Sequence, residues 1–109
     1  MKHTIFEKIL LSHCTANVPV CEEIHIGDIV EVSIDRVMIH DFFTPFCINK
    51  FREMEFKRVF DPDKVVFIYD HLIPTTFQDD YRHHKIAEEF AREHQIKNVH
   101  RSDGVCHQL

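Results

Sequence analysis

Residues 65–74 read VVFIYDHLIP, a run of β-branched and aromatic residues that ends in an acid, a histidine and a proline. Such a run, closed by turn-forming residues, predicts a buried strand over 65–69 that enters a loop. Asp70 and His71 then follow the carboxyl end of the strand, which borders the ligand crevice in open α/β sheets. They are candidates for a functional site; alternatively, Asp70 forms an Asx-turn and His71 is an exposed loop residue.

The rest of the chain alternates between helical and extended patterns. Thr4 can cap a short amphipathic helix, and Pro45 fits the first turn of a second helix. The alternating apolar residues Val30, Val32 and Ile34 indicate a half-buried strand. The expected helices cover 4–13, 44–56 and 79–94, and the expected strands cover 28–40, 65–69 and 96–100. This order predicts an α/β fold in three layers, with a parallel-type sheet and flanking helices.

Apolar side chains at helical spacing indicate which helix faces are buried. They are Phe46, Ile48, Phe51 and Met54 in the second helix, and Ile86, Ala87 and Phe90 in the third. The segment HDFFTPFCI, residues 40–48, also brings three phenylalanines close together. These phenylalanines form either an exposed apolar patch or ordinary core around the start of the helix.

Each predicted strand is followed by a histidine. His40 and Asp41 end the first strand, Asp70 and His71 follow the second, and Cys106 and His107 lie beyond the third. Because parallel strands end at the same edge of a sheet, these histidines are expected to face one crevice.

Length and composition indicate a globular protein of one domain. The chain has 109 residues, of which 44% are hydrophobic and 28% charged, and its net charge is −5. Without a basic block it lacks the electrostatic footprint of a nucleic-acid-binding protein. No apolar window approaches the roughly 20 residues of a membrane span, and the first residues lack a signal-peptide pattern. We therefore expect a cytoplasmic protein that binds neither nucleic acid nor membrane.

The cysteines and histidines do not predict a metal site. Cys14, Cys21, Cys47 and Cys106 are spaced too irregularly for a metal motif, and without a secretion signal they are expected to be reduced thiols. The ten histidines include no pair of the H-x-x-x-H form with a third ligand at a known spacing. We therefore expect no metal ligands in this chain.

Four blocks of the sequence together resemble a known family. GDIVEVSIDRVMIHD, FREMEFKRVFDPDKVVFIYDHLIP, HKIAEEFAREHQIKN and GVCHQ are similar, in order and spacing, to the N-terminal part of 3-isopropylmalate dehydratase large subunits, within the aconitase superfamily. Homoaconitase and 2,3-dimethylmalate dehydratase are similar to the same blocks. The resemblance runs from about Thr4 to Leu109, so residues 1–109 are expected to form a single partial aconitase-like domain, truncated at its C-terminus. The last loop departs from the family pattern, which usually has a second glycine at the position of Ser102.

The resemblance implies a hydro-lyase that interconverts 2-isopropylmalate and 3-isopropylmalate, in leucine biosynthesis, by removing and adding water. In that family the Asp-His pair assists the leaving hydroxyl, which corresponds to Asp70 and His71. The histidine of the C-H-Q block, here His107, shares this task. The H-D block, here His40 and Asp41, contacts the hydroxy-di- or tricarboxylate substrate.

The same resemblance implies that much of the active site lies elsewhere. The family binds a [4Fe-4S] cluster through three cysteines downstream of the C-H-Q block, so this chain is expected to ligate none. The base that removes the carbon-bound proton belongs to a small subunit or swivelling domain. We therefore expect the chain to be inactive alone and to need that partner and the rest of the large subunit.

Two other interpretations remain open. The chain could be a non-catalytic truncated module that binds a metabolite or a partner chain, or a histidine-rich metal-binding protein. A parallel sheet that stops after three strands has open edges, so homo-oligomers through an exposed edge are also expected.

Overall fold

The computed structural model describes residues 2–15 and 23–109. The chain divides into two compact units, Met1–Asp35 and Arg36–Leu109. The single domain expected over 1–109 stays a prediction. In the described residues no helix is both long and apolar enough to cross a lipid bilayer.

The first unit contains the expected N-terminal helix. α1 spans Ile5–His13, and Thr4 caps it in a capping box with Glu7. The prediction of a strand over 28–40 is wrong for most of this range, because only Val37–His40 forms a strand. Before that point, residues 28–35 have one isolated bridge, between Val32 and Cys14, and hydrogen bonds join the loops around it. Without a continuous partner strand, the alternating apolar pattern does not become a sheet.

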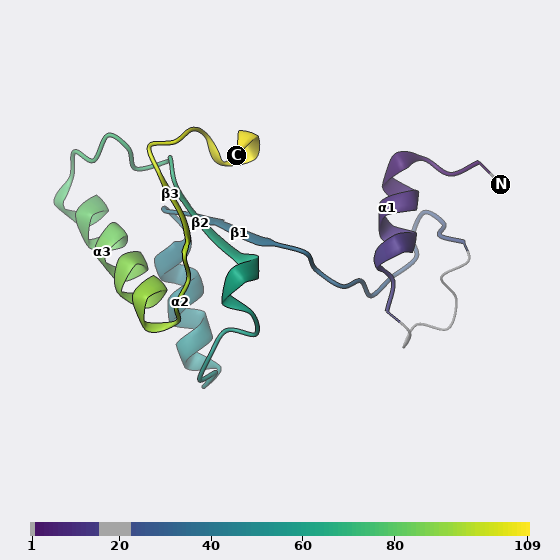
Figure 1. The fold of residues 1–109 in the computed structure, drawn as a ribbon, viewed down its shortest axis with the longest axis horizontal. Coiled ribbons are helices and arrows are strands. Elements are labelled where there is room, and N and C mark those ends of the chain that lie inside the picture. The colour runs from purple at the N-terminus through teal and green to yellow at the C-terminus, as the bar shows by residue number, and fades with distance from the viewer. Residues whose placement is uncertain (1, 16–22) are drawn as a thin grey trace. The chain divides into compact units, whose positions relative to one another are not determined.

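The second unit is a three-stranded parallel sheet with two helices (Figure 1). β1 spans Val37–His40, β2 spans Val65–Tyr69 and β3 spans Asn98–Arg101, in the order β1-β2-β3. α2, Thr44–Glu53, connects β1 to β2, and α3, Gln78–Glu93, connects β2 to β3. A short 3-10 helix, Pro62–Lys64, leads into β2. The predicted parallel sheet with flanking helices is confirmed.

Both helices of this unit pack on the same face of the sheet. Ile48 of α2 and Ala87 and Phe90 of α3 form one core cluster with Phe67 and Tyr69 of β2. Residues 36–109 therefore build two layers, and they do not supply the third layer that the sequence suggested. Three residues expected on the apolar helix faces are instead exposed: Phe46, Met54 and Ile86.

The cysteines differ in state. Cys47 and Cys106 are free thiols, as expected, with Cys106 buried and Cys47 exposed. Cys14 is disulfide-bonded, which corrects the expectation of a reduced thiol at that position. Cys21 lies outside the described residues.

Candidate functional site

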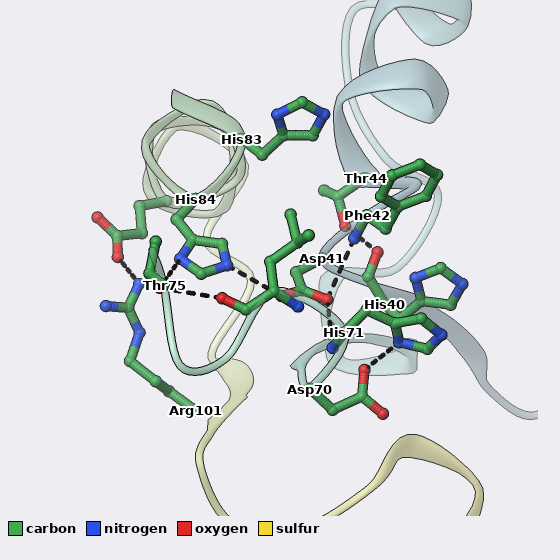
Figure 2. Close-up of polar contacts among 12 residues, drawn as sticks. His40, Asp41, Phe42, Thr44, Asp70, His71, Thr75, His83, His84 and Arg101 are labelled. Carbon is green, nitrogen blue, oxygen red and sulfur yellow. Dashed lines mark hydrogen bonds and ion pairs between the residues drawn. The ribbon is translucent and has the colours of Figure 1, made fainter. Parts of the chain in front are cut away.

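The carboxyl ends of β1 and β2 bring two Asp-His dipeptides together (Figure 2). The parallel pairing continues one residue beyond β1, where the Asp41 amide donates a hydrogen bond to the Ile68 carbonyl at 2.9 Å. Successive residues of a strand point to opposite faces. His40 therefore turns toward His71, whereas Asp41 turns toward α3 and the helix-covered face.

His40 and His71 stack on each other. Their ring centroids are 3.7 Å apart and their planes are inclined by 13°, and the Phe43 ring lies 4.9 Å from His40. Nδ1 of His40 is buried without a hydrogen-bond partner in the described part of the chain. Burial and the neighbouring His71 charge lower the pKa of His40, so its imidazole is neutral at pH 7.

Asp70 holds His71 from the other side. Nδ1 of His71 lies 2.5 Å from Oδ1 of Asp70, and Oδ2 of Asp70 accepts a hydrogen bond from the Cys106 amide at 2.6 Å. Burial raises the pKa of Asp70, but the hydrogen bonds from His71 and Cys106 outweigh it and lower the pKa to about 2. The Asp70 side chain is 7% exposed and that of His71 is 46% exposed, so the acid is covered while its imidazole faces outward.

The C-terminal segment brings the third predicted element to the same edge. Residues Cys106–Gln108 form a 3-10 turn, in which Cys106 is buried and His107 is exposed. Burial, together with the Asp70 carboxylate, raises the pKa of the Cys106 thiol. The charge of His107 contributes to lowering the pKa of His40, which indicates that the two imidazoles are within electrostatic range. The loop before them contains Ser102 at φ 61°, in the left-handed region that favours glycine.

Asp41 lies in the interior and its carboxylate is fully occupied. Oδ1 accepts hydrogen bonds from the amides of Phe42 and His71 at 3.1 and 3.0 Å. Oδ2 accepts from the Leu72 amide at 2.9 Å and lies 2.9 Å from Nε2 of His84. Asp41 is 0% exposed, so in this structure its carboxylate offers no surface to a substrate. Burial raises the pKa of Asp41, but the hydrogen bonds from His84 and the two loop amides lower it overall.

His84 joins this network, although it was not among the site residues predicted from the sequence. His84 is 4% exposed, its ring is stacked on Tyr69 at a centroid distance of 4.7 Å, and the two planes differ by 2°. One signal was available, because His84 shares its helix face with Ala87 and Ala91, three and seven positions later, and both are buried. A histidine on the apolar face of a helix needs a polar partner in the core, and Asp41 is that partner.

The rings of His40 and His71 do not converge on one metal ion. Donor atoms of Asp70, His71 and Cys106 lie within 4.8 Å of one another, as do those of His40, Asp41 and His71. His71 is already bonded to Asp70 through Nδ1. The rings of His40 and His71 lie in nearly parallel planes, so their in-plane lone pairs cannot point at one ion.

The described residues also do not fit a [4Fe-4S] cluster that needs three thiolates. The free thiols among them are Cys47 and Cys106. Cys47 lines an apolar cavity of about 350 Å³ together with Ile39 and Phe51, on the face covered by the helices. Cys106 lies at the strand edge beside Asp70.

Comparisons with known proteins identify relatives that match the whole chain. It is 39% identical, over all 109 residues, to the 3-isopropylmalate dehydratase large subunit of Methanoregula boonei. It is 37% identical, over its full length, to 3-isopropylmalate dehydratase large subunit 1 of Methanopyrus kandleri. Over 97% of the chain it is 36% identical to the methanogen homoaconitase large subunit of Methanocaldococcus jannaschii. The resemblance found in the sequence is thus confirmed.

The match covers only part of each relative. The chain spans 25% of the Methanoregula and Methanopyrus proteins and 24% of the Methanocaldococcus protein, about a quarter of the curated relatives it matches. No protein-family model matches the chain.

Proposed function

We propose that this chain is a partial active-site module of a hydro-lyase of the 3-isopropylmalate dehydratase type, and that it acts in the cytoplasm. The observation that carries the proposal is the Asp70–His71 pair, which presents an imidazole at the carboxyl edge of a parallel sheet. The whole-length similarity to dehydratase large subunits supports the same reaction class. The substrate class would be a hydroxy-di- or tricarboxylate.

His71 is suited to protonate a leaving hydroxyl. Hydroxide is a poor leaving group, and a general acid near the operating pH lowers the cost of its departure. Asp70 is ionised at neutral pH, so the Nδ1–H group of His71 donates to its carboxylate. Nε2 then remains as the atom that carries the transferable proton toward the substrate. The same atom would take the proton back when water adds in the reverse direction.

We assign supporting roles to the two other histidines. His107 is exposed at the same edge and would share proton transfer to the hydroxyl. His40 is held neutral by burial and by the charge of His71, so it would contact the substrate as a hydrogen-bonding group and not as a cation. Asp41, the other predicted substrate contact, is buried, and we propose a different role for it below.

The remaining parts of the catalytic machinery would come from other polypeptide segments. A [4Fe-4S] cluster in the complete enzyme would bind the hydroxyl and carboxylate of the substrate, but the described thiols of this chain do not fit its ligand set. A small-subunit or swivelling-domain partner would supply the base. Alone, the 109-residue chain would therefore be catalytically inactive.

A second candidate function is the dehydration of a different hydroxy acid, homocitrate, by the same residues. One of the matching relatives is a homoaconitase large subunit, whose identity of 36% is close to the 39% of the Methanoregula dehydratase. The residues at the strand edge handle the hydroxyl, which both substrate types share. A non-catalytic module that binds a metabolite or a partner chain remains the alternative from a different class.

The test is to replace the matching quarter of the Methanoregula large subunit with this chain. The spliced subunit is combined with its small subunit, loaded with cluster and assayed for dehydration of 3-isopropylmalate and of homocitrate. We expect hydro-lyase activity on at least one of them. A correctly folded, cluster-loaded splice that dehydrates neither would overturn the proposal and favour the binding module.

Single substitutions in the splice test the residue roles. His71→Ala and His107→Ala should lower kcat by roughly 100-fold or more, as is usual when a general acid is removed. His83→Ala is the matched control, since His83 is a histidine of α3 that interacts with the Phe42 and Phe46 rings instead of the site. Its kcat should remain within a factor of two or so of the parent, because it contributes no proton.

A further inference from the structure

We propose that Asp41, held by His84, is a positioning residue that fixes the imidazole of His71. This inference rests on the proposed function for its catalytic meaning, but its structural claim can be tested without any reaction. Asp41 is fully buried and directly follows β1. Its carboxylate contacts the loop after β2, at residues that are 30 and 31 positions later in the sequence.

The carboxylate of Asp41 holds the backbone of the loop after β2. Its Oδ1 accepts from the amide of His71 at 3.0 Å and its Oδ2 accepts from the amide of Leu72 at 2.9 Å. Two consecutive amides are thus bound by the two oxygens of one carboxylate. Hydrogen bonds to an ionised acceptor are about twice as strong as neutral ones, so this clamp strongly restrains the backbone of His71.

His84 holds the carboxylate on the opposite side. Its Nε2 lies 2.9 Å from Oδ2 of Asp41, and its ring is fixed by face-to-face stacking on Tyr69. The guanidinium of Arg101 lies 4.7 Å from the centroid of the Tyr69 ring. The orientation of Asp41 is therefore set by buried His84 of α3, whose ring packs on Tyr69 in the core cluster.

Thr75 closes the loop onto the same network (Figure 2). Its hydroxyl donates to the carbonyl of Leu72 at 3.0 Å and lies 3.5 Å from Nδ1 of His84. The loop is thus tied to His84 directly through Thr75 and indirectly through Asp41. Both connections meet at Leu72, the residue next to His71.

The imidazole of His71 depends on this backbone position. Nδ1 at the edge of its ring lies 2.5 Å from Oδ1 of Asp70, and the face of its ring stacks on His40 with the centroids 3.7 Å apart. His40 and Asp41 are adjacent, so one strand end supplies both the stacking ring and the backbone clamp. Catalytic groups lose much of their effect when displaced by about 1 Å, which makes such a clamp functionally significant.

The experiment is NMR spectroscopy on the 109-residue chain, comparing the parent with Asp41→Asn. Asparagine keeps the size but has an NH2 group in place of one carboxylate oxygen, and His71 and Leu72 donate to different oxygens of Asp41, so in this geometry one of the two amides faces a donor. We expect at least one of these two amides to exchange about tenfold faster relative to the Phe67 amide, as a lost hydrogen bond of about 1.4 kcal/mol implies. We also expect the His71 ring ¹⁵N shifts to move away from the Nδ1–H tautomer.

Ala87→Gly is the control for a general loss of stability. Ala87 is 0% exposed in α3, and glycine there weakens the helix while the side chains of Asp41, His84 and the loop stay the same. In this variant the exchange rates should change together and the His71 ring shifts should stay at their parent values. If Asp41→Asn gives the same pattern as Ala87→Gly, Asp41 is merely structural and the proposal is overturned.

His84→Gln provides a second test if Asp41→Asn does not fold. It removes the ring that orients Asp41 but leaves the carboxylate and both amides in place. A selective shift of the His71 ring signals, in the same direction and smaller, supports the clamp, and an unchanged His71 overturns it. Neither result depends on hydro-lyase activity, so a failed dehydratase assay would not be mistaken for failure of this inference.

Discussion

His40 and His71 stack with ring centroids 3.7 Å apart, although they come from different strand ends. At this separation two imidazolium charges would repel each other strongly, so the stack favours states with at most one positive charge. Burial of His40, together with the charge of His71, lowers the pKa of His40, whereas Nδ1 of His71 is hydrogen-bonded to Asp70. The stacked pair thereby places a neutral imidazole against one whose Nδ1 is held by a carboxylate.

The first prediction concerns acid stability and Asp70. Its pKa is about 2 in the folded chain against 3.8 ordinarily, so its ionised form stabilises the fold above about pH 4. This contribution is lost as pH falls through about 2. Asp70→Asn should therefore be less stable than the parent by about 2 kcal/mol at pH 5, and the difference should shrink toward pH 2. Urea unfolding at several pH values measures it; a difference that stays constant with pH would contradict the prediction.

The second prediction concerns the two free thiols. Cys106 is buried and its pKa is raised by burial and by the Asp70 carboxylate, whereas Cys47 is exposed. Because the thiolate is the reactive form, iodoacetamide at pH 8 should label Cys47 at least about tenfold faster than Cys106. Asp70→Asn removes one cause of the raised pKa and should speed labelling of Cys106 but not of Cys47. Peptide mass spectrometry resolves the two sites, and equal rates in the parent chain would refute the burial of Cys106.

A third prediction follows from the backbone at Ser102. Its φ of 61° is unfavourable for a residue with a Cβ atom and is readily adopted by glycine. Ser102→Gly should raise the free energy of unfolding by roughly 0.5–1 kcal/mol, the cost of the left-handed conformation less the entropy of glycine. Ser102→Ala is the control, because it removes the hydroxyl but keeps Cβ. A stabilising Ser102→Ala would show that the backbone is not the cause.

The fourth prediction concerns the aromatic patch, which we define as Phe42, Phe43 and Phe46. All three rings are exposed and lie within 6.3 Å of one another, centroid to centroid, so the segment forms a surface patch and not the core around a helix start. Clustered exposed apolar groups promote association, so Phe46→Ser should lower the average mass in sedimentation equilibrium relative to the parent chain.

The control for this measurement is Phe77→Ser, which removes an exposed phenylalanine outside the patch. It should leave the average mass at the parent value. A dimer that persists unchanged in Phe46→Ser would instead indicate pairing through the edge strands β1 or β3, whose outer backbone groups have no partner strand in the described sheet.

The elements with strong local patterns were predictable from sequence. β2 was predicted at 65–69, the bounds that the structure has, because five consecutive apolar residues are bounded by turn residues. α3 was predicted within one residue at each end. The meeting of His40, Asp70 and His71 followed from parallel topology alone, since parallel strands end at one edge.

Long-range contacts could not be predicted in this way. The alternation of Val30, Val32 and Ile34 has the period of a strand, but period does not show whether a partner strand is present, and the structure forms β1 only from Val37. The contact between Asp41 and His84 joins positions 43 residues apart, and neither local pattern indicates the other. The burial of Asp41 therefore became visible only in three dimensions.

The opposite orientations of His40 and Asp41 limit how the sequence of this segment can evolve. Deleting or inserting one residue within Val37–His40 would move each later side chain of this segment to the opposite face of the sheet. The carboxylate would then turn toward solvent and the imidazole toward the interior. Substitutions in β1 can accumulate one by one, whereas length changes there would disable both residues together, so we expect homologous genes to vary in composition across this strand while keeping its length.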